Sequence, residues 1–274
     1  MTTLKAPANS CDCHFHIFDN RFPALAGPRP TDYPVSAYRL IQQRTGTTRA
    51  VVVSPRAYVT NHQCLLDAIS QLGPARTRGV AVVHPTVSDA ELTMLADAGI
   101  RGIRFTVESP AGAVTTLDMI EPLAKRVHAL GWHVQIHMLA DQIVENKDLL
   151  NRLAAPIVFD HMGRIPHQAG GSAHPAFAVM RGLIDKGRAW VKLSPTTFNG
   201  RSNGYATWKQ MTDAAHALIK AAPERVVWGS DWPHRSEKEM PDDAALFERL
   251  TEYARDQPTL QKILVDNPAT LYGF

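Results

Sequence analysis

Short apolar runs rich in β-branched residues alternate with longer amphipathic segments along the chain. The apolar runs have the length and composition of strands, and they lie at 12–17, 50–54, 79–83, 102–107, 133–138, 157–161, 190–194 and 226–231. Segments with helical spacing follow them at 36–44, 61–72, 89–98, 117–130, 142–153, 176–186, 205–221 and 244–255, with a short last helix near 260–265. Runs such as 50–53 are almost entirely apolar, which is typical of parallel strands covered by helices on both faces.

Eight strand–helix units in about 250 residues predict an α/β fold, a single (β/α)8 barrel of the TIM type. A doubly wound open sheet would usually have a glycine-rich phosphate turn after its first strand, and no such turn follows 12–17. The chain shows no internal repeat and no flexible linker, so we expect one catalytic domain over residues 1–274. The longest irregular segments, 19–35, 165–175 and 198–204, are expected at the mouth of the barrel.

With 274 residues, of which 45% are hydrophobic and 20% charged, the chain has the composition of a globular protein. Its net charge is only +3 and the basic residues are scattered, so we expect no nucleic-acid partner. No apolar stretch approaches the ~18 residues of a membrane span, and the first residues lack a signal-peptide pattern. We therefore expect a cytoplasmic protein without a membrane partner, either a monomer or a homodimer. The cysteines are expected to be buried free thiols, and they are Cys11, Cys13 and Cys64.

In a (β/α)8 barrel the chemistry takes place at the carboxyl ends of the strands, and four of these ends carry histidine or aspartate. They are His14 and His16 at the end of the first strand, His137 on the fifth, Asp160 and His161 on the sixth, and Asp231 on the eighth. Three imidazoles and one carboxylate are enough for one divalent cation and a bound water. The metal-ligand candidates are His14, His16, His137 and Asp231. His161 is then free to act as an acid or a base.

Other polar residues near the expected mouth are candidates for binding the substrate. They are Tyr33 in the first irregular segment, Ser54 and Arg56 after the second strand, Arg104 on the fourth, Arg201 after the seventh and His234 after the eighth. Three arginines would make the mouth cationic although the chain as a whole is almost neutral, which favours an anionic substrate. Arg164, after the sixth strand, is interpreted as structural, either pairing with Asp160 or capping the loop.

Five motifs resemble the amidohydrolase superfamily and keep its order. They read Cys-Asp-Cys-His-Phe-His-Ile-Phe-Asp at 11–19, Arg-Gly-Ile-Arg-Phe at 101–105, Phe-Asp-His-Met-Gly-Arg at 159–164, Trp-Gly-Ser-Asp-Trp-Pro-His at 228–234 and Asn-Pro-Ala-Thr-Leu-Tyr-Gly-Phe at 267–274. Within the superfamily they are most similar to the 2-pyrone-4,6-dicarboxylate lactonases and related lactone-processing enzymes. The resemblance runs almost end to end.

The resemblance implies hydrolysis of a carboxylate-bearing lactone, such as a pyrone dicarboxylate, a muconolactone-type lactone from aromatic-compound breakdown, or a sugar-acid lactone. It implies that Asp231 takes a proton from the attacking water and that His161 places the water or polarises the carbonyl, beside His14 and His16. Apart from the resemblance, an attacking water must lose a proton, and the developing oxyanion needs a nearby imidazole, guanidinium or metal. Arg104 resembles the arginine with which the family clamps a substrate carboxylate, a contact suited to bidentate geometry.

Two departures from the family pattern bear on the cofactor and the substrate. The pyrone-dicarboxylate lactonases work without metal and carry tyrosine on the fifth strand, where this chain has His137. They also have a second basic residue soon after the position of Arg104, which this chain lacks. A histidine on the fifth strand is similar to metal-using relatives, so we expect one divalent metal, Zn²⁺ in first place. The alternative is a metal-free enzyme in which His137 binds the substrate.

Two other classes of function are open. The first is a lyase or isomerase on the same barrel, since related amidohydrolases include metal-dependent decarboxylases and lactone isomerases. The second is a barrel that binds a ligand without turnover. The second class gives no reason for histidine and aspartate at four strand ends.

Overall fold

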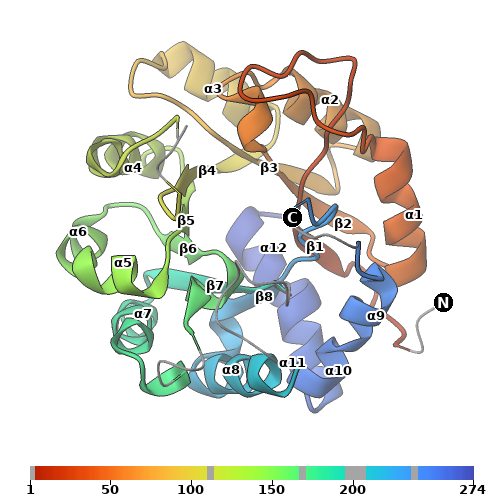
Figure 1. The fold of residues 1–274 in the computed structure, drawn as a ribbon, viewed down its shortest axis with the longest axis vertical. Helices are drawn as coiled ribbons and strands as arrows, with labels where there is room; N and C mark the ends of the chain where they lie inside the picture. Colours follow the sequence, from red (N-terminus) through yellow and green to blue (C-terminus); the bar gives the residue numbers. More distant parts are fainter. Residues whose placement is uncertain (1–3, 110–113, 167–170, 195–207, 236–239) are drawn as a thin grey trace.

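The computed structural model describes residues 4–109, 114–166, 171–194, 208–235 and 240–274. Eight parallel strands form one sheet in sequence order, surrounded by helices (Figure 1). The strands are β1 (Cys11–Phe15), β2 (Arg49–Val53), β3 (Thr77–Ala81), β4 (Ile100–Thr106), β5 (His133–His137), β6 (Ile157–Phe159), β7 (Ala189–Leu193) and β8 (Val226–Trp228). This topology confirms the predicted (β/α)8 barrel.

Most of the expected helices are found near the expected positions. They are α1 (Val35–Thr45), α2 (Gln63–Leu72), α3 (Asp89–Asp97), α4 (Ile120–His128), α5 (Ala140–Glu145), α6 (Lys147–Arg152), α7 (Pro175–Asp185), α8 (Trp208–Ala221), α9 (Asp243–Glu248), α10 (Leu250–Tyr253), α11 (Gln257–Gln261) and α12 (Asn267–Tyr272). Short helical turns lie between them: η1 (Arg56–Tyr58), η2 (Leu117–Met119), η3 (His161–Arg164), η4 (Gly171–Ala173), η5 (Pro223–Arg225) and η6 (Lys262–Asp266).

The predicted helix at 244–255 is wrong in one respect, because the structure divides it into α9 and α10. The predicted helix at 142–153 is wrong in the same respect, because the structure divides it into α5 and α6. The division falls at Asn146, whose backbone has φ −101° and ψ 17°. Its side-chain amide donates to the Gln142 carbonyl at 2.8 Å. This local bond competes with the regular helical pattern.

The sixth and eighth strands are shorter than predicted, because the chain turns sharply before the predicted ends at His161 and Asp231. The backbone φ angles are 49° at His161 and 63° at Asp231, in the left-handed region that no strand can continue through. Non-glycine residues hold such angles only where the surroundings fix them, and these positions cluster at functional sites. Both residues therefore lie on turns at the mouth, not within strands.

Backbone hydrogen bonds join the ends of the first and last strands. The Asp231 N–H donates to the His14 carbonyl at 2.7 Å, and the His16 N–H donates to the Trp232 carbonyl at 2.8 Å. The barrel thereby brings two distant parts of the sequence into direct contact at the mouth.

The core has two parts, one on each side of the strands. The larger part packs the outward faces of the strands against the helices and includes Phe15, Ile103 and Trp228. The smaller part includes Cys11, Cys13 and Tyr272 of the C-terminal α12, which lies near the barrel axis (Figure 1). All three cysteines are buried free thiols, as predicted. No described helix is long and apolar enough to cross a membrane.

Candidate active site

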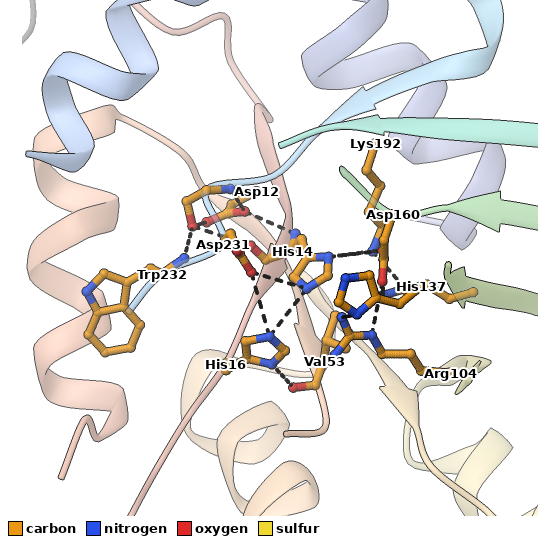
Figure 2. Close-up of polar contacts among 12 residues, drawn as sticks. Asp12, His14, His16, Val53, Arg104, His137, Asp160, Lys192, Asp231 and Trp232 are labelled. Atoms are coloured by element: carbon orange, nitrogen blue, oxygen red, sulfur yellow. Dashed lines mark hydrogen bonds and ion pairs between the residues drawn. The ribbon is translucent and has the colours of Figure 1, made fainter. Parts of the chain in front are cut away.

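His14, His16 and Asp231 converge at the mouth of the barrel (Figure 2). The Nε2 atoms of the two histidines are 3.4 Å apart. Asp231 Oδ1 lies 3.5 Å from Nε2 of His14 and 3.7 Å from Nε2 of His16. His14 is fully buried, whereas 23% of the Asp231 side chain is exposed, so a substrate can reach this carboxylate from the mouth.

A buried carboxylate, Asp12, shapes the end of β1 that carries the two histidines. The pairing of β1 with β2 shifts register between Asp12 and Phe15, the signature of a β-bulge. Asp12 Oδ1 accepts the N–H groups of His14 at 3.1 Å and Ser230 at 2.9 Å. Its Oδ2 accepts the hydroxyls of Ser230 at 2.6 Å and Tyr38 at 3.1 Å. Asp12 therefore connects the bulge at the end of β1 to Ser230, which lies in the loop after β8 that carries Asp231.

The hydrogen-bond partner of His16 fixes which of its ring nitrogens carries the proton. His16 Nδ1 lies 2.8 Å from the Val53 carbonyl oxygen, and a carbonyl can only accept. The proton of the neutral ring is therefore on Nδ1. The lone pair of Nε2 faces Asp231 and His14.

His14 Nδ1 lies 3.3 Å from Asp160 Oδ1 and 3.4 Å from the Lys192 ammonium, contacts that favour opposite tautomers. With the proton on Nδ1, His14 can donate to the Asp160 carboxylate; with the proton on Nε2, it accepts from the Lys192 ammonium. Lys192 already donates to Gln135 Oε1 at 2.6 Å. In the first of these two tautomers His14, like His16, directs an Nε2 lone pair at Asp231, as a metal ligand must.

Burial decides the charge of these groups. It lowers the pKa of His16 to about 3, with a further contribution from the positive charge of Arg104, and it lowers the pKa of His14 well below its ordinary value. Burial raises the pKa of Asp231 to about 6. At neutral pH the site therefore contains two neutral imidazoles and one ionised carboxylate.

This donor set fits one divalent cation. Ligand atoms at about 2.0–2.1 Å from a tetrahedral zinc ion lie about 3.4 Å from one another. The separations among His14 Nε2, His16 Nε2 and Asp231 Oδ1 are 3.4, 3.5 and 3.7 Å. Three lone pairs at these distances leave a fourth position open. His137 lies outside this convergent group, although the sequence placed it among the ligand candidates.

A buried polar network lies next to these residues. Arg104 Nε donates to Asp160 Oδ2 at 3.0 Å, and the Gln135 amide donates to the same oxygen at 3.1 Å. Burial alone would raise the pKa of Asp160, but the positive charges of Arg104 and Lys192 and the contact with His14 hold it well below its usual range. Burial lowers the pKa of Lys192 to about 8.

Gln135, Lys192 and Asp12 were not singled out as functional residues from the sequence. Their signal is a polar residue within a predicted parallel strand, and each of them is almost completely buried. Buried polar groups need partners, so such positions indicate a network inside the barrel.

His161 lies between two other histidines. Its ring centroid is 5.0 Å from that of His14 and 5.1 Å from that of His137. Its Nδ1 is buried without a hydrogen-bond partner in the described part of the chain.

Arg164 ion-pairs with Glu108 at 3.6 Å, which corrects the expected pairing with Asp160.

The remaining candidates lie around this centre in different roles. Arg56 and Arg104 line one small cavity between the ends of β2, β3 and β4. Ser54 is buried. Tyr33 packs edge-on against Trp232, with ring centroids 5.6 Å apart. His234 Nε2 contacts the buried carboxylate of Asp243 at 2.8 Å, which ties this ring to α9. Arg201 lies outside the described residues.

Comparisons with known proteins place the chain in a family. A family model of amidohydrolases matches residues 11–274. A 2-pyrone-4,6-dicarboxylate hydrolase of Comamonas testosteroni is 34% identical over 98% of this chain and 92% of its own length. A 4-sulfomuconolactone hydrolase of Rhizobium radiobacter is 33% identical over 99% of this chain and 92% of its own length. The chain belongs to the amidohydrolase family, as its motifs predicted.

A further relative, a D-galactarolactone isomerase of Agrobacterium fabrum, is 28% identical over 97% of this chain and 91% of its own length. A solved structure from Agrobacterium tumefaciens has a TM-score of 0.89 at 25% identity and covers 100% of this chain and 99% of its own. A second solved structure is that of a probable 2-pyrone-4,6-dicarboxylic acid hydrolase from Acinetobacter baumannii with citric acid bound. It has a TM-score of 0.81 at 27% identity and covers 97% of this chain and 100% of its own. These structures share the barrel fold of this chain.

Proposed function

We propose that the protein is a lactonase, a hydrolase that opens a carboxylate-bearing lactone with water. The observation that carries the proposal is the convergence of Asp231 with two neutral imidazoles, His14 and His16, near the guanidinium of Arg104. Two relatives that match nearly the whole chain are named as hydrolases of a pyrone dicarboxylate and a sulfomuconolactone, both anionic lactones.

In the proposed reaction, Asp231 accepts a proton from a water as the water oxygen attacks the lactone carbonyl. A tetrahedral oxyanion forms, and it collapses with cleavage of the ring C–O bond. The leaving ring oxygen takes up the proton that Asp231 accepted, and the new carboxylic acid releases one proton to solvent. His161 is placed beside His14 to orient the water or to stabilise the oxyanion.

Arg104 has the charge and the geometry to hold the substrate carboxylate. It uses Nε for Asp160 and one Nη2 hydrogen for His137, and its other N–H groups are the ones a carboxylate would contact. Arg56 lines the same cavity. Two arginines on one side of the mouth favour an anionic ring substrate. Ser54, Tyr33, Arg201 and His234 stay sequence-based candidates for substrate contacts.

We propose Zn²⁺ as the cofactor, because the three donor atoms match a tetrahedral nitrogen and oxygen site. His14, His16 and Asp231 would hold the ion. A bound ion of this kind lowers the pKa of a coordinated water toward ~7 and polarises a carbonyl. A cytoplasmic location, a monomeric or homodimeric state and a role in aromatic-compound catabolism belong to the same proposal.

Isomerisation of a lactone is the second candidate function, favoured by the similarity to a D-galactarolactone isomerase. An isomerase moves a proton or the acyl group within the ring and consumes no water. A decarboxylase remains a weaker alternative from the sequence, and it would release carbon dioxide.

The experiment is an assay of purified protein against three anionic lactones: 2-pyrone-4,6-dicarboxylate, a muconolactone and a sugar-acid lactone. Proton release is followed in weak buffer, before and after treatment with a chelator. Ring opening with one proton released supports the proposal. Turnover without proton release favours the isomerase, and carbon dioxide release favours the decarboxylase.

A further inference from the structure

His137 is the last residue of β5, and its ring lies beside Arg104 (Figure 2). Its ring centroid is 5.1 Å from that of His161. The side chain is almost entirely buried, with 7% of the residue exposed. Its Nδ1 is 3.3 Å from Nη2 of Arg104. A guanidinium has only N–H donors, so His137 Nδ1 must be the acceptor in this contact.

The ring of His137 is neutral under ordinary conditions. Burial lowers its pKa well below the usual value, and the positive charges of Arg104 and Arg164 lower it further. A neutral imidazole carries one proton, and Nδ1 is accepting. The proton is therefore on Nε2.

Arg104 cannot easily turn away from this contact. Its Nε donates to Asp160 at 3.0 Å, and Gln135 donates to the same carboxylate oxygen. Lys192 in turn holds Gln135 through a bond of 2.6 Å. The network keeps the guanidinium plane fixed, and with it the tautomer of His137.

His137 Nε2 is buried and has no hydrogen-bond partner among the described residues. A buried N–H without an acceptor is rare in native proteins, so an acceptor beyond the described residues is expected at this position, and a bound substrate can supply it. His16 differs from His137 in this respect, because the Val53 carbonyl at its Nδ1 leaves a lone pair on Nε2.

We propose that Arg104 is a positioning residue that fixes His137 as the Nε2–H tautomer, and that His137 donates a hydrogen bond to a substrate oxygen instead of binding a metal. A metal ligand needs a lone pair on the nitrogen that faces the ion, and here that nitrogen carries hydrogen. No bond forms or breaks at His137, which keeps its proton throughout. The substrate part of this inference rests on the proposed lactone hydrolysis.

The tautomer is tested without any activity. ¹⁵N-labelled histidine distinguishes a protonated ring nitrogen from an unprotonated one, and the His137 signals are those that disappear in His137→Tyr. The expected result is a protonated Nε2 in the wild type and a shift toward the mixed tautomers of a free imidazole in Arg104→Met. A protonated Nδ1 in the wild type, or an unchanged tautomer in Arg104→Met, overturns the inference.

The role at the site is tested with two variants. His137→Tyr keeps a donor, whereas His137→Phe removes it. Removal of one preorganised donor usually costs about 100-fold or more in rate, so we expect kcat to fall by about that factor in His137→Phe. In His137→Tyr, which keeps a donor, we expect kcat to fall by about tenfold or less. Zinc affinity, measured by titration of the chelated protein, is expected to stay within about threefold of wild type in both, whereas His16→Phe weakens it at least about tenfold.

A parallel loss of zinc affinity in His137→Tyr and His137→Phe makes His137 a ligand and contradicts the inference. If neither the wild type nor the variants bind zinc, His137 is not a zinc ligand. Equal kcat values for His137→Tyr and His137→Phe would then contradict its role as a hydrogen-bond donor. If no lactone is turned over, the proposed function fails, but the NMR result still decides the tautomer.

Discussion

Two of the imidazoles at the mouth, His16 and His137, each contact a group whose hydrogen-bonding role is fixed by its chemistry. The Val53 carbonyl can only accept, so His16 keeps its proton on Nδ1. The Arg104 guanidinium can only donate, so His137 keeps its proton on Nε2. Two histidines at the same mouth therefore present different groups to a ligand: His16 presents an Nε2 lone pair, and His137 presents an Nε2–H. This sorting depends on neighbours that are distant in sequence, so no sequence pattern could have predicted it.

Asp231→Asn removes the base and keeps the shape of the side chain. General-base catalysis typically contributes about 100-fold to 10,000-fold, so we expect kcat to fall by about that factor. KM is expected to change little, because the carboxylate acts on the water and not on the substrate. Steady-state kinetics measure both, and a circular dichroism melt controls for folding. Activity within about twofold of wild type would remove Asp231 from the mechanism.

The proposed base also predicts a pH dependence. Burial raises the pKa of Asp231 to about 6 in the metal-free protein, with opposing contributions from His234, Arg104 and Arg164 and a raising one from Asp160. A base acts when ionised, so kcat/KM for the activity that the chelated enzyme retains should fall about tenfold per pH unit below 6 and level off above 7. The ¹³C resonance of the Asp231 carboxyl group should titrate with the same midpoint. Activity that rises as the pH falls below 6 contradicts the assignment.

Arg104→Met tests recognition of the substrate anion. The variant loses the contact with a substrate carboxylate, so we expect KM to rise strongly for a carboxylate lactone and little for its neutral ester. The ester is the matched control, since it has the same ring without the charge. An equal rise in KM for both substrates would leave Arg104 only its role in the buried network with Asp160 and His137.

At the level of elements, hydrophobic periodicity predicted all eight strands, because parallel strands are apolar runs that differ sharply from amphipathic helices. Strand ends were harder to predict. β6 and β8 stop before His161 and Asp231, where backbone angles in the left-handed region turn the chain. Such angles depend on contacts across the mouth. The β-bulge at the end of β1 has the same origin in the contacts of Asp12.

Asp12→Ala tests the element that carries the two histidines. The substitution leaves buried donors of Ser230, Tyr38 and His14 without an acceptor, which is expected to lower the free energy of unfolding by about 3 kcal/mol. Because the bulge positions His14, kcat should fall as well. Denaturant unfolding and kinetics measure the two effects.

Ser88→Ala is the control for stability alone. Ser88 caps α3 by accepting from the Glu91 N–H at 3.1 Å. Its loss is expected to cost ~1 kcal/mol with kcat unchanged. If Asp12→Ala lowers stability without lowering kcat below that of Ser88→Ala, Asp12 does not position the site.

For the whole molecule, the barrel and the strand ends that carry His14, His16 and Asp231 could be predicted from the sequence, since the fold brings all strand ends to one mouth. The network of Gln135 and Lys192 could not, because an isolated polar residue in an apolar strand gives no information about its partner. The same holds for the closing bonds between β1 and β8, which set the spacing of the three donor atoms.

The reaction in ¹⁸O-labelled water tests the proposed function most directly. The protein is incubated with an anionic lactone, and the mass of the product is measured by mass spectrometry. A reaction with Asp231→Asn under the same conditions is the control. Hydrolysis by an activated water predicts one ¹⁸O atom in the new carboxylate, and about 100-fold less of this product, or lower still, from the variant in the same time. A product of unchanged mass without ¹⁸O, or a product lighter by carbon dioxide, would contradict the proposal.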